Sequence, residues 1–442
     1  MSALVTVEAE PVAEPSRQVR VKAPLTIEQA GLSADLVLQL VLKALYLGDA
    51  TGLDLDRKLC LPFPALEPLV SHARMERLIE VKNSAAALQA GAAGYRYALT
   101  DAGRTRAQQF LEASQYVGPA PVPLPQYVTA VAAQAIERST IDRERLAAGL
   151  SHLVVNRRML DQLGPAVNAG KALFLYGPAG NGKTAIARAI GRTLGGTIHV
   201  PHAVEVDGQI ILVHDPVNHS PRERARPATD QLVMEDTWDR RWVVIERPVV
   251  VVGGELTLDL LDLRFDPLSR FYEAPLQMKA NGGVLLVDDF GRQRVAARDL
   301  LNRWIVPLES RVDYLTLHTG QKFEVPFDVF TVFATNLDPE ALADEAFLRR
   351  IPYKIHASDP TPEEYARIFE LDCARRGLAY KPAIVEYLMR EYYQGRGLKR
   401  RACHPRDLIE QVVALARFQG RQPALARDLV DAACQSYFLT EA

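Results

Sequence analysis

The sequence contains no long hydrophobic run. Its longest apolar stretches, such as Val249 to Val252, fall far short of the roughly 20 residues that cross a bilayer, so no membrane span is expected. Residues 1–25 also lack the basic start and apolar core of an export signal. We expect them to form a disordered lead-in.

Cysteine is scarce as well. The four cysteines, Cys60, Cys373, Cys403 and Cys434, lie far apart and form no CxxC pair. This spacing argues against a disulfide framework and against a thiolate zinc site. Together with the absent export signal, it favours a cytoplasmic location.

An excess of charge of either sign is absent too. Lys and Arg number 52 against 54 Asp and Glu, which leaves a formal net charge of −2. No global field therefore draws the chain to nucleic acid or to acidic membranes, and any polyanion site must be local. With 442 residues, 48% hydrophobic and 24% charged, the chain has ordinary globular composition and room for about three domains.

Residues 26–116 are predicted to form a small α+β domain. Three helices are expected in succession, followed by two strands around a Gly/Ala-rich turn and a further helix from Asp101. This order resembles a winged helix, which implies either duplex binding or protein docking. The segment holds nine Lys and Arg against ten Asp and Glu, and this net charge of −1 favours docking because a duplex-binding module has a basic footprint.

Residues 117–126 contain four prolines and no charge, and they are predicted to form a semi-stiff linker. A long α/β pattern follows over 127–355, and the pattern over 356–442 is entirely helical.

The strongest motif lies where an apolar strand, Ala172 to Tyr176, enters a glycine-rich loop and then a helix. The loop matches GxxxxGK[ST] in full. Glycines allow backbone N–H groups to surround a phosphate, the lysine reaches the terminal phosphates and the hydroxyl suits Mg²⁺. The predicted nucleotide-binding residues are Gly177, Pro178, Ala179, Gly180, Asn181, Gly182, Lys183, Thr184 and Ala185.

A second buried strand, 282–287, ends in two carboxylates, Asp288 and Asp289. Ligands of parallel α/β sheets bind beyond the carboxyl ends of the strands. Asp288 is therefore a candidate to hold Mg²⁺ together with Thr184, and Asp289 to polarise the attacking water.

These two motifs resemble those of the AAA+ ATPases, and three further segments follow in the order of that family. Asn336, after the strand 328–335, is similar to sensor 1. Arg349 and Arg350 resemble the arginine finger that completes the site of a neighbouring subunit, with Arg349 preferred. Arg406 is similar to sensor 2, in a helical lid. The resemblance implies a P-loop α/β core, ATP and Mg²⁺ as ligands, and a homo-oligomeric ring, most simply a hexamer.

Many family members carry Asp-Glu where this chain has Asp288-Asp289, so slow hydrolysis is expected. The segment 279–283 and the predicted hairpin 312–326 resemble the clade of magnesium chelatase subunits and MCM helicases. In relatives this hairpin projects toward a central pore, where Lys322 or His318 would touch a threaded substrate; a hairpin that only packs is the alternative.

Residues 195–247 form a long insertion, interpreted as a surface that contacts a partner or substrate. A zinc site within this insertion is the weaker alternative to a contact surface, and it is considered because imidazoles bind this metal. The histidines concerned are His199, His202, His214 and His219. A basic loop in the helical part, from Arg396 to Arg401, is interpreted as solvated, with phosphate or nucleic-acid binding as the alternative.

The sequence thus predicts an ATP-hydrolysing AAA+ protein, and three roles remain open. The first is an oligomeric remodeller or assembly factor recruited through its N-terminal domain. The second is a nucleic-acid-dependent ATPase, and the third is an ATP-switched binding protein with little turnover.

Overall fold

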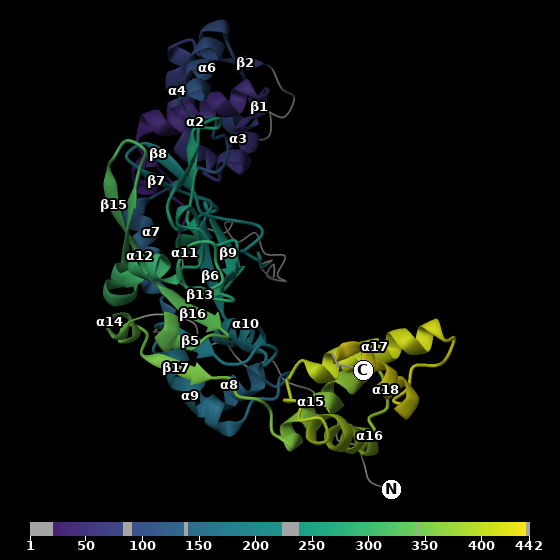
Figure 1. Ribbon diagram of the computed structural model, residues 1–442. Coiled ribbons are helices and arrows are strands. Elements are labelled where there is room, and N and C mark those ends of the chain that lie inside the picture. Colours follow the sequence, from purple (N-terminus) through teal and green to yellow (C-terminus); the bar gives the residue numbers. More distant parts are fainter. Residues whose placement is uncertain (1–20, 83–90, 137–139, 223–237, 343, 439–442) are drawn as a thin grey trace. The chain divides into compact units, whose positions relative to one another are not determined.

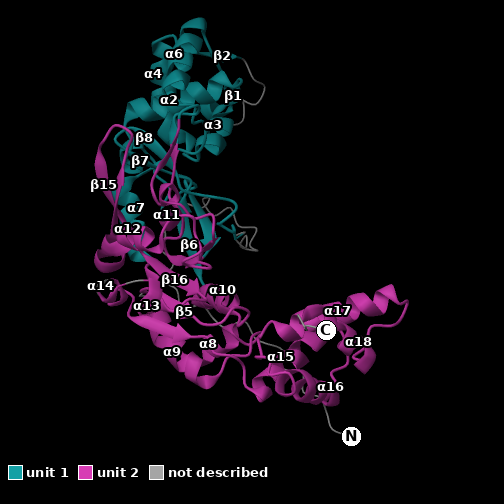
Figure 2. Cartoon of the chain, viewed as in Figure 1, with its two compact units in different colours: residues 1–134, 195–246, 267–271 teal, residues 135–194, 247–266, 272–442 magenta. Residues whose placement is uncertain are grey.

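The computed structural model describes residues 21–82, 91–136, 140–222, 238–342 and 344–438 (Figure 1). Most of the predicted lead-in lies outside these residues, as does the turn between the two N-terminal strands. The chain divides into two compact units (Figure 2). Unit 1 comprises residues 1–134, 195–246 and 267–271, and unit 2 comprises 135–194, 247–266 and 272–442.

The helices and strands predicted for residues 26–116 are confirmed. Unit 1 begins with a short helix, and the Ser33 hydroxyl then caps the next one by accepting a 3.2 Å hydrogen bond from the Leu36 amide. The sequence did not indicate β1, which completes an antiparallel sheet in the order β1-β3-β2. The elements are α1 (Ile27–Ala30), α2 (Ala34–Tyr46), β1 (Ala50–Thr51), α3 (Gly52–Leu59), α4 (Phe63–Met75), β2 (Ile79–Lys82), η1 (Gly91–Gly94), β3 (Arg96–Leu99) and α6 (Asp101–Ala113).

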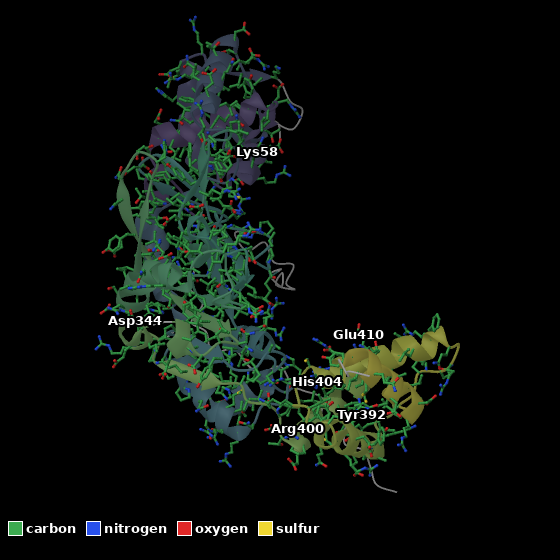
Figure 3. The ribbon with its side chains drawn as sticks, in the orientation of Figure 1. Lys58, Asp344, Tyr392, Arg400, His404 and Glu410 are labelled. Atoms are coloured by element: carbon green, nitrogen blue, oxygen red, sulfur yellow. The ribbon has the colours of Figure 1, made fainter. Side chains whose placement is uncertain are left out.

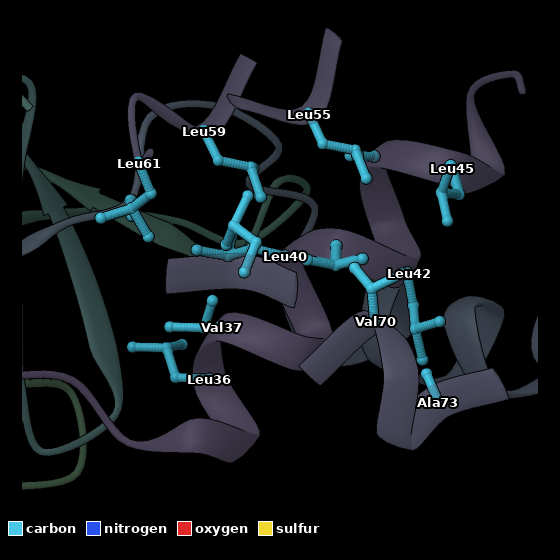
Figure 4. Close-up of a cluster of buried hydrophobic side chains, with 14 of the residues drawn as sticks. Leu36, Val37, Leu40, Leu42, Leu45, Leu55, Leu59, Leu61, Val70 and Ala73 are labelled. Carbon is cyan, nitrogen blue, oxygen red and sulfur yellow. The ribbon is translucent and has the colours of Figure 1, made fainter. Parts of the chain in front are cut away.

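One apolar core holds these helices together. Val37, Leu40 and Leu42 of α2 are fully buried against Leu55, Leu59 and Val70 of the neighbouring helices (Figure 4). Burying such a side chain contributes about 1.5–3 kcal/mol each. The core therefore fixes the arrangement of α2, α3 and α4.

The prediction of a linker at 117–126 is wrong. Ala120 and Val122 are fully buried, and the Ala120 amide donates a 2.7 Å hydrogen bond to the Leu59 carbonyl. The strand β4 (Val122–Pro123) pairs in parallel with β7 (Ala203–Val206), and α7 (Leu124–Ala133) follows. An uncharged, apolar segment can be buried without desolvating charge, and this gain outweighs the stiffness that its prolines suggest.

Residues 195–246 of the predicted insertion belong to unit 1 rather than to unit 2. Its strand β6 (Thr197–Pro201) pairs antiparallel with β9 (Trp242–Glu246), and β7 pairs antiparallel with β8 (Gln209–Leu212). Ala203 and Ile210 lie in the same apolar core as the N-terminal helices. The domain boundary predicted at residue 127 is therefore not the boundary between the two compact units.

Unit 2 is built around a five-stranded, entirely parallel sheet, as the predicted α/β class requires. The strand order is β10-β13-β16-β5-β17. The strands are β5 (Leu173–Tyr176), β10 (Val249–Val252), β13 (Gly283–Val287), β16 (Val329–Thr335) and β17 (Tyr353–His356).

Both faces of this sheet are covered, which explains why its inner strands are mostly apolar. On one face Leu173 and Leu175 pack with Ile186 and Ile190 of α10 (Lys183–Leu194). On the other face Phe174 lies in a cluster with Trp304 of α12 (Ala297–Ser310). The remaining elements are α8 (Arg143–Gly149), α9 (Arg157–Asn168), η3 (Leu258–Leu261), β11 (Arg264–Asp266), β12 (Phe271–Glu273), α11 (Leu276–Lys279), β14 (Val312–Thr316), β15 (Lys322–Pro326), α13 (Pro339–Leu342) and α14 (Glu345–Leu348).

The described part of the chain after His356 contains only helices, which we call the C-terminal helices. The first begins with a capping box between Thr361 and Glu364. The helices have an apolar core of their own, which includes Tyr365, Phe369 and Leu429. They are α15 (Pro362–Arg375), α16 (Pro382–Leu388), the π-helical turn η4 (Met389–Gln394), α17 (His404–Phe418) and α18 (Arg427–Tyr437). Within the described ranges, no helix combines the length and the apolar character that a bilayer crossing needs.

Candidate nucleotide site

The glycine-rich loop joins β5 to the first turn of α10, and its surroundings leave no room for a side chain at two of its glycines. Gly177 has φ 132°, and a Cβ there would lie 2.6 Å from the Ala357 carbonyl oxygen. Gly180 has φ 84°, and a Cβ there would lie 2.6 Å from Cys403 Sγ. Glycine is therefore required at both positions, because a side chain would be both strained and in collision.

Lys183 is the first residue of α10, and its ammonium group is held inside the loop. Nζ donates hydrogen bonds to the carbonyl oxygens of Gly177 at 2.9 Å and Pro178 at 3.0 Å. Burial lowers the pKa of Lys183, and the nearby charges of Asp289 and Asp288 oppose this shift. A buried cation among carbonyl dipoles and carboxylates is suited to bind a polyanion.

The side chains of Thr184, in α10, and Asp288, which follows β13, form a hydrogen bond within unit 2. Thr184 Oγ1 donates a 2.7 Å hydrogen bond to Asp288 Oδ2. The other carboxylate oxygen accepts a 3.1 Å hydrogen bond from the Asp289 amide. Asp289 itself has φ 47°, in the left-handed region that only a minority of residues other than glycine adopt. Both oxygens of the Asp288 carboxylate are therefore held by hydrogen bonds at the end of β13.

The pair of Thr184 and Asp288 fits a divalent cation. A hydroxyl and a carboxylate are the hard oxygen ligands that Mg²⁺ prefers, and Mg²⁺ takes the rest of its shell from water and substrate phosphates. At 2.7 Å apart, the two oxygens are close enough for one ion to bind both.

Lys183, Thr184 and the two carboxylates line one cavity of about 520 Å³. The predicted residues Ala179 to Ala185 line it, together with Asp288, Asp289 and Arg406. Its apolar lining comes from Leu153, Val154, Val155, Ile186, Ile368 and Leu371. The cavity thus has charged groups suited to phosphates and apolar groups suited to a base. Gly177 and Pro178 contribute through the carbonyls that hold Lys183.

The C-terminal helices contact the loop directly. The Cys403 amide donates a 2.8 Å hydrogen bond to the Gly180 carbonyl, and the Ala402 amide donates one of 3.2 Å to Asn181 Oδ1. Arg406 lies in the first turn of α17, where its guanidinium is paired with Asp407 at 2.8 Å. The predicted sensor 2 arginine therefore lines the same cavity as Lys183.

The basic loop before α17 is largely tied to the protein. Arg400 Nε donates to the Pro360 carbonyl at 3.0 Å, Arg401 is paired with Asp359, and Arg396 lies over the Tyr392 ring (Figure 3). These contacts account for three of the four basic side chains without a nucleic-acid ligand.

Asn336 follows β16, and the structure places it outside the lining of the cavity. Its Oδ1 is buried, and no described residue donates a hydrogen bond to it. The neighbouring Thr335 hydroxyl donates 2.8 Å to the Phe290 carbonyl, which ties this strand end to the segment after Asp289. An unsatisfied buried oxygen at this edge is consistent with a polar site that takes water or substrate.

Arg349 and Arg350 do not line the nucleotide cavity of their own chain. They follow α14, whose N-cap is Asp344 (Figure 3). Arg350 pairs with Glu309 at 3.0 Å and borders a separate cavity of about 430 Å³ beside α12. Arg349 is exposed, and none of the described residues pairs with its guanidinium. Arg349 is thus the more available of the two to act outside its own chain.

The predicted hairpin 312–326 is present as the antiparallel pair of β14 and β15. His318 at its turn stacks on Phe265 with ring centroids 4.3 Å apart, and its amide donates a 2.9 Å hydrogen bond to the Tyr272 hydroxyl. His318 therefore packs, as the alternative reading expects, whereas Lys322 is exposed on β15.

The hypothesis of a zinc site in the insertion is wrong for the residues described. No cluster of three or more His, Cys, Asp or Glu side chains that could hold a metal occurs in the described ranges. The His199 ring instead lies tilted against Trp238, and His202 packs edge-on against His214. Burial lowers the pKa of His202 to about 4, so this ring stays neutral at ordinary pH. These histidines are structural.

Sequence reasoning missed one side of the site. The segment 152–155, before α9, and one face of α15 line the cavity without any recognisable motif. The α15 residues Ile368, Leu371, Asp372 and Arg375 share a face because their spacing is helical, but this spacing alone equally predicts a packing face.

A family model described as a domain of unknown function, DUF8689, matches residues 361–436, which correspond to the C-terminal helices. No sequence among the curated proteins searched matches the chain.

Solved structures resemble parts of the chain. NtrX from Brucella abortus in complex with ADP has a TM-score of 0.40 and 15% sequence identity, and the match covers 68% of this chain and 58% of NtrX. The chain thus spans less than two thirds of the length of that structure. The Holliday junction branch migration motor RuvB from Thermotoga maritima has a TM-score of 0.36 and 14% identity over 64% of this chain and 69% of RuvB. A complex of the magnesium chelatase subunits BchI and BchD has a TM-score of 0.30 and 15% identity over 64% of this chain and 92% of that one.

Proposed function

We propose that this protein is an AAA+ ATPase that works as a homo-oligomeric ring, most simply a hexamer, and remodels or assembles a partner protein. The single observation that carries the proposal is the meeting of Thr184 with Asp288 at 2.7 Å beside the buried Lys183. The parallel strand order β10-β13-β16-β5-β17 supports it, because it brings the loop after β5 and the carboxylates after β13 to one edge of the sheet.

Each residue of the site has a proposed role in hydrolysis. The loop amides and Lys183 would bind the triphosphate, and Thr184 with Asp288 would hold Mg²⁺. When bound, Mg²⁺ neutralises part of the phosphate charge. Asp289 would orient the attacking water and accept its proton, and Asn336 would help to fix that water. Arg406 would bind the terminal phosphate from the C-terminal helices.

Completion of the site would need a second copy of the chain. A guanidinium stabilises the charge that spreads over the phosphoryl oxygens in the transition state, and it stays protonated at any working pH. Arg349 is exposed and lies outside its own cavity, which supports its role as a finger in a neighbouring subunit. Arg350 is the less favoured candidate because it already pairs with Glu309.

Residues 26–116, which lie in unit 1, are proposed as a winged-helix-like recruitment module. The order of helices and strands from α2 to β3, with the sheet β1-β3-β2, supports this fold. The near-neutral charge of residues 26–116 favours a protein partner over a nucleic acid. The substrate of the ring would be delivered through this module.

The decisive experiment measures nucleotide binding and ATP turnover by the full chain with and without Lys183. Lys183→Ala is expected to abolish binding of ATP in a fluorescent-nucleotide titration. The matched control is Lys171→Ala, which removes an exposed lysine just before β5 and should leave affinity unchanged. Full affinity in Lys183→Ala would refute the site. Turnover stimulated by DNA rather than by a protein partner would refute the proposed role while leaving the ATPase intact.

A further inference from the structure

One carboxylate that lines the candidate nucleotide cavity has no role in the proposed phosphate binding and hydrolysis. Asp372 lies in α15 and lines the cavity, although the residue is only 4% exposed. Leu371 and Asp372 follow Ile368 by three and four residues, so both lie beside Ile368 on the face of α15 that lines the cavity. It is therefore grouped with the apolar side chains suited to the faces of a base, rather than with Lys183 and Asp288.

The two oxygens of Asp372 have different surroundings. Arg375 donates a 2.9 Å hydrogen bond to Oδ1, and the second arm of the same guanidinium donates to the His152 carbonyl. No described residue donates to Oδ2. Burial raises the pKa of Asp372, and the ion pair with Arg375 opposes this shift. The result is one acceptor oxygen without a described donor, on a largely buried residue that lines the cavity.

We propose that Asp372 selects adenine nucleotides by accepting a hydrogen bond from the exocyclic 6-amino group of the base. This inference rests on the proposed nucleotide site. A lone carboxylate oxygen can only accept, so it favours the 6-amino group of adenine and disfavours the 6-oxo group of hypoxanthine, which is itself an acceptor. Pairing with the two adjacent N–H groups of guanine would need both oxygens, and Arg375 already holds one.

Arg375 is a positioning residue in this arrangement. One arm of its guanidinium donates to Asp372 and the other to the carbonyl of His152, the first residue of the cavity-lining segment 152–155. It therefore fixes the carboxylate relative to the apolar residues that would flank the base.

The test uses the full chain and nucleoside diphosphates, which avoid hydrolysis during titration. ADP is expected to bind roughly 10- to 100-fold more tightly than IDP, the size of a hydrogen bond to a buried charged group. In Asp372→Asn, Arg375 will hold the amide oxygen, so the amide N–H₂ will replace the free carboxylate oxygen. The preference should then invert toward IDP. Glu370→Gln is the control, because it removes a carboxylate from the same helix that pairs with Arg367 and does not line the cavity.

The remaining outcomes separate the inference from the proposed function. Equal affinities of ADP and IDP, or a preference for GDP, would overturn the inference while nucleotide binding stands. Failure of every diphosphate to bind would instead refute the proposed site. If Asp372→Asn does not fold, N6,N6-dimethyl-ADP tests the same contact on the unchanged protein and should bind as weakly as IDP. If 2′-deoxy-ADP binds more weakly than ADP while IDP binds as tightly as ADP, Asp372 contacts the sugar instead of the base, and the inference is overturned.

Discussion

Asn181 Nδ2 donates a 2.8 Å hydrogen bond to Asp359 Oδ1, which joins the glycine-rich loop to the segment before α15. The same Asn181 side chain contacts the Ala357 carbonyl and accepts from the Ala402 amide. Asp359 in turn pairs with Arg401. The Asn181 side chain thus connects the glycine-rich loop to both ends of the segment that carries α15 and α16. A change in the position of the loop is therefore expected to shift the C-terminal helices.

Asn181→Ala is expected to loosen this connection. The Ala402 amide and the Asp359 carboxylate would each lose a hydrogen bond, at a cost of about 1 kcal/mol per bond. Hydrogen exchange of residues 401–403 should accelerate, and ATP affinity should fall several-fold. Asn302→Ala, at an exposed position of α12, is the matched control. Unchanged exchange in Asn181→Ala would contradict the coupling.

Asp289→Asn is expected to bind ATP with nearly normal affinity and to hydrolyse it 10²- to 10⁴-fold more slowly, the usual loss when a general base is removed. Thr184 and Asp288 remain in place in this variant, so Mg²⁺ and ATP would still be held. Single-turnover hydrolysis and a nucleotide titration on the same sample measure the two effects. Rapid turnover by Asp289→Asn would show that another residue positions the water.

Arg349→Ala should keep ATP binding and lose hydrolysis, because the residue lies outside its own cavity. Mixing it with Lys183→Ala should restore part of the activity, since a Lys183→Ala subunit still offers an intact Arg349 to an Arg349→Ala neighbour. Arg350→Ala is the comparison and should lose less activity. Absence of rescue in fully assembled mixtures would exclude a site shared between subunits.

Lys43→Met should stabilise unit 1 in a pH-dependent way. Lys43 is 1% exposed, with Nζ bonded to the Ser114 carbonyl, and burial lowers its pKa from 10.5 to about 8. The unfolded chain therefore binds more protons than the folded one between about pH 8 and 10.5, so the free energy of unfolding of the wild type rises with pH through this window.

Below pH 8 the wild type carries the whole penalty, up to about 3 kcal/mol from the shift of the pKa, less about 1 kcal/mol for the lost hydrogen bond to Ser114. Lys43→Met should gain this difference at pH 7 and lose it by pH 10.5, as followed by urea unfolding. Lys58→Met, at a less buried position of α3 (Figure 3), is the matched control. An equal gain at both pH values would contradict a buried charge.

The parts of the fold that the sequence predicted are those with local signals. The strand, loop and helix around Lys183 and the carboxylates after β13 follow from contiguous motifs, and the structure brings them together at one edge of the sheet. The folding of residues 117–126 into unit 1 could not be predicted, because proline content describes stiffness and not what the side chains pack against. The contribution of α15 to the cavity depends on how distant segments pack, which no spacing reveals.

The shared core of unit 1 also bears on how this protein can be dissected. The chain passes between the two units at residues 134/135, 194/195, 246/247, 266/267 and 271/272. Ala203 and Ile210 of the insertion are buried in the same cluster as Leu40 and Leu59. Removal of the first 126 residues would thus take away the apolar side chains against which the insertion packs, so the proposed ATPase part cannot be isolated by trimming one end. A module grafted in place of these residues would have to supply a new apolar surface for the insertion.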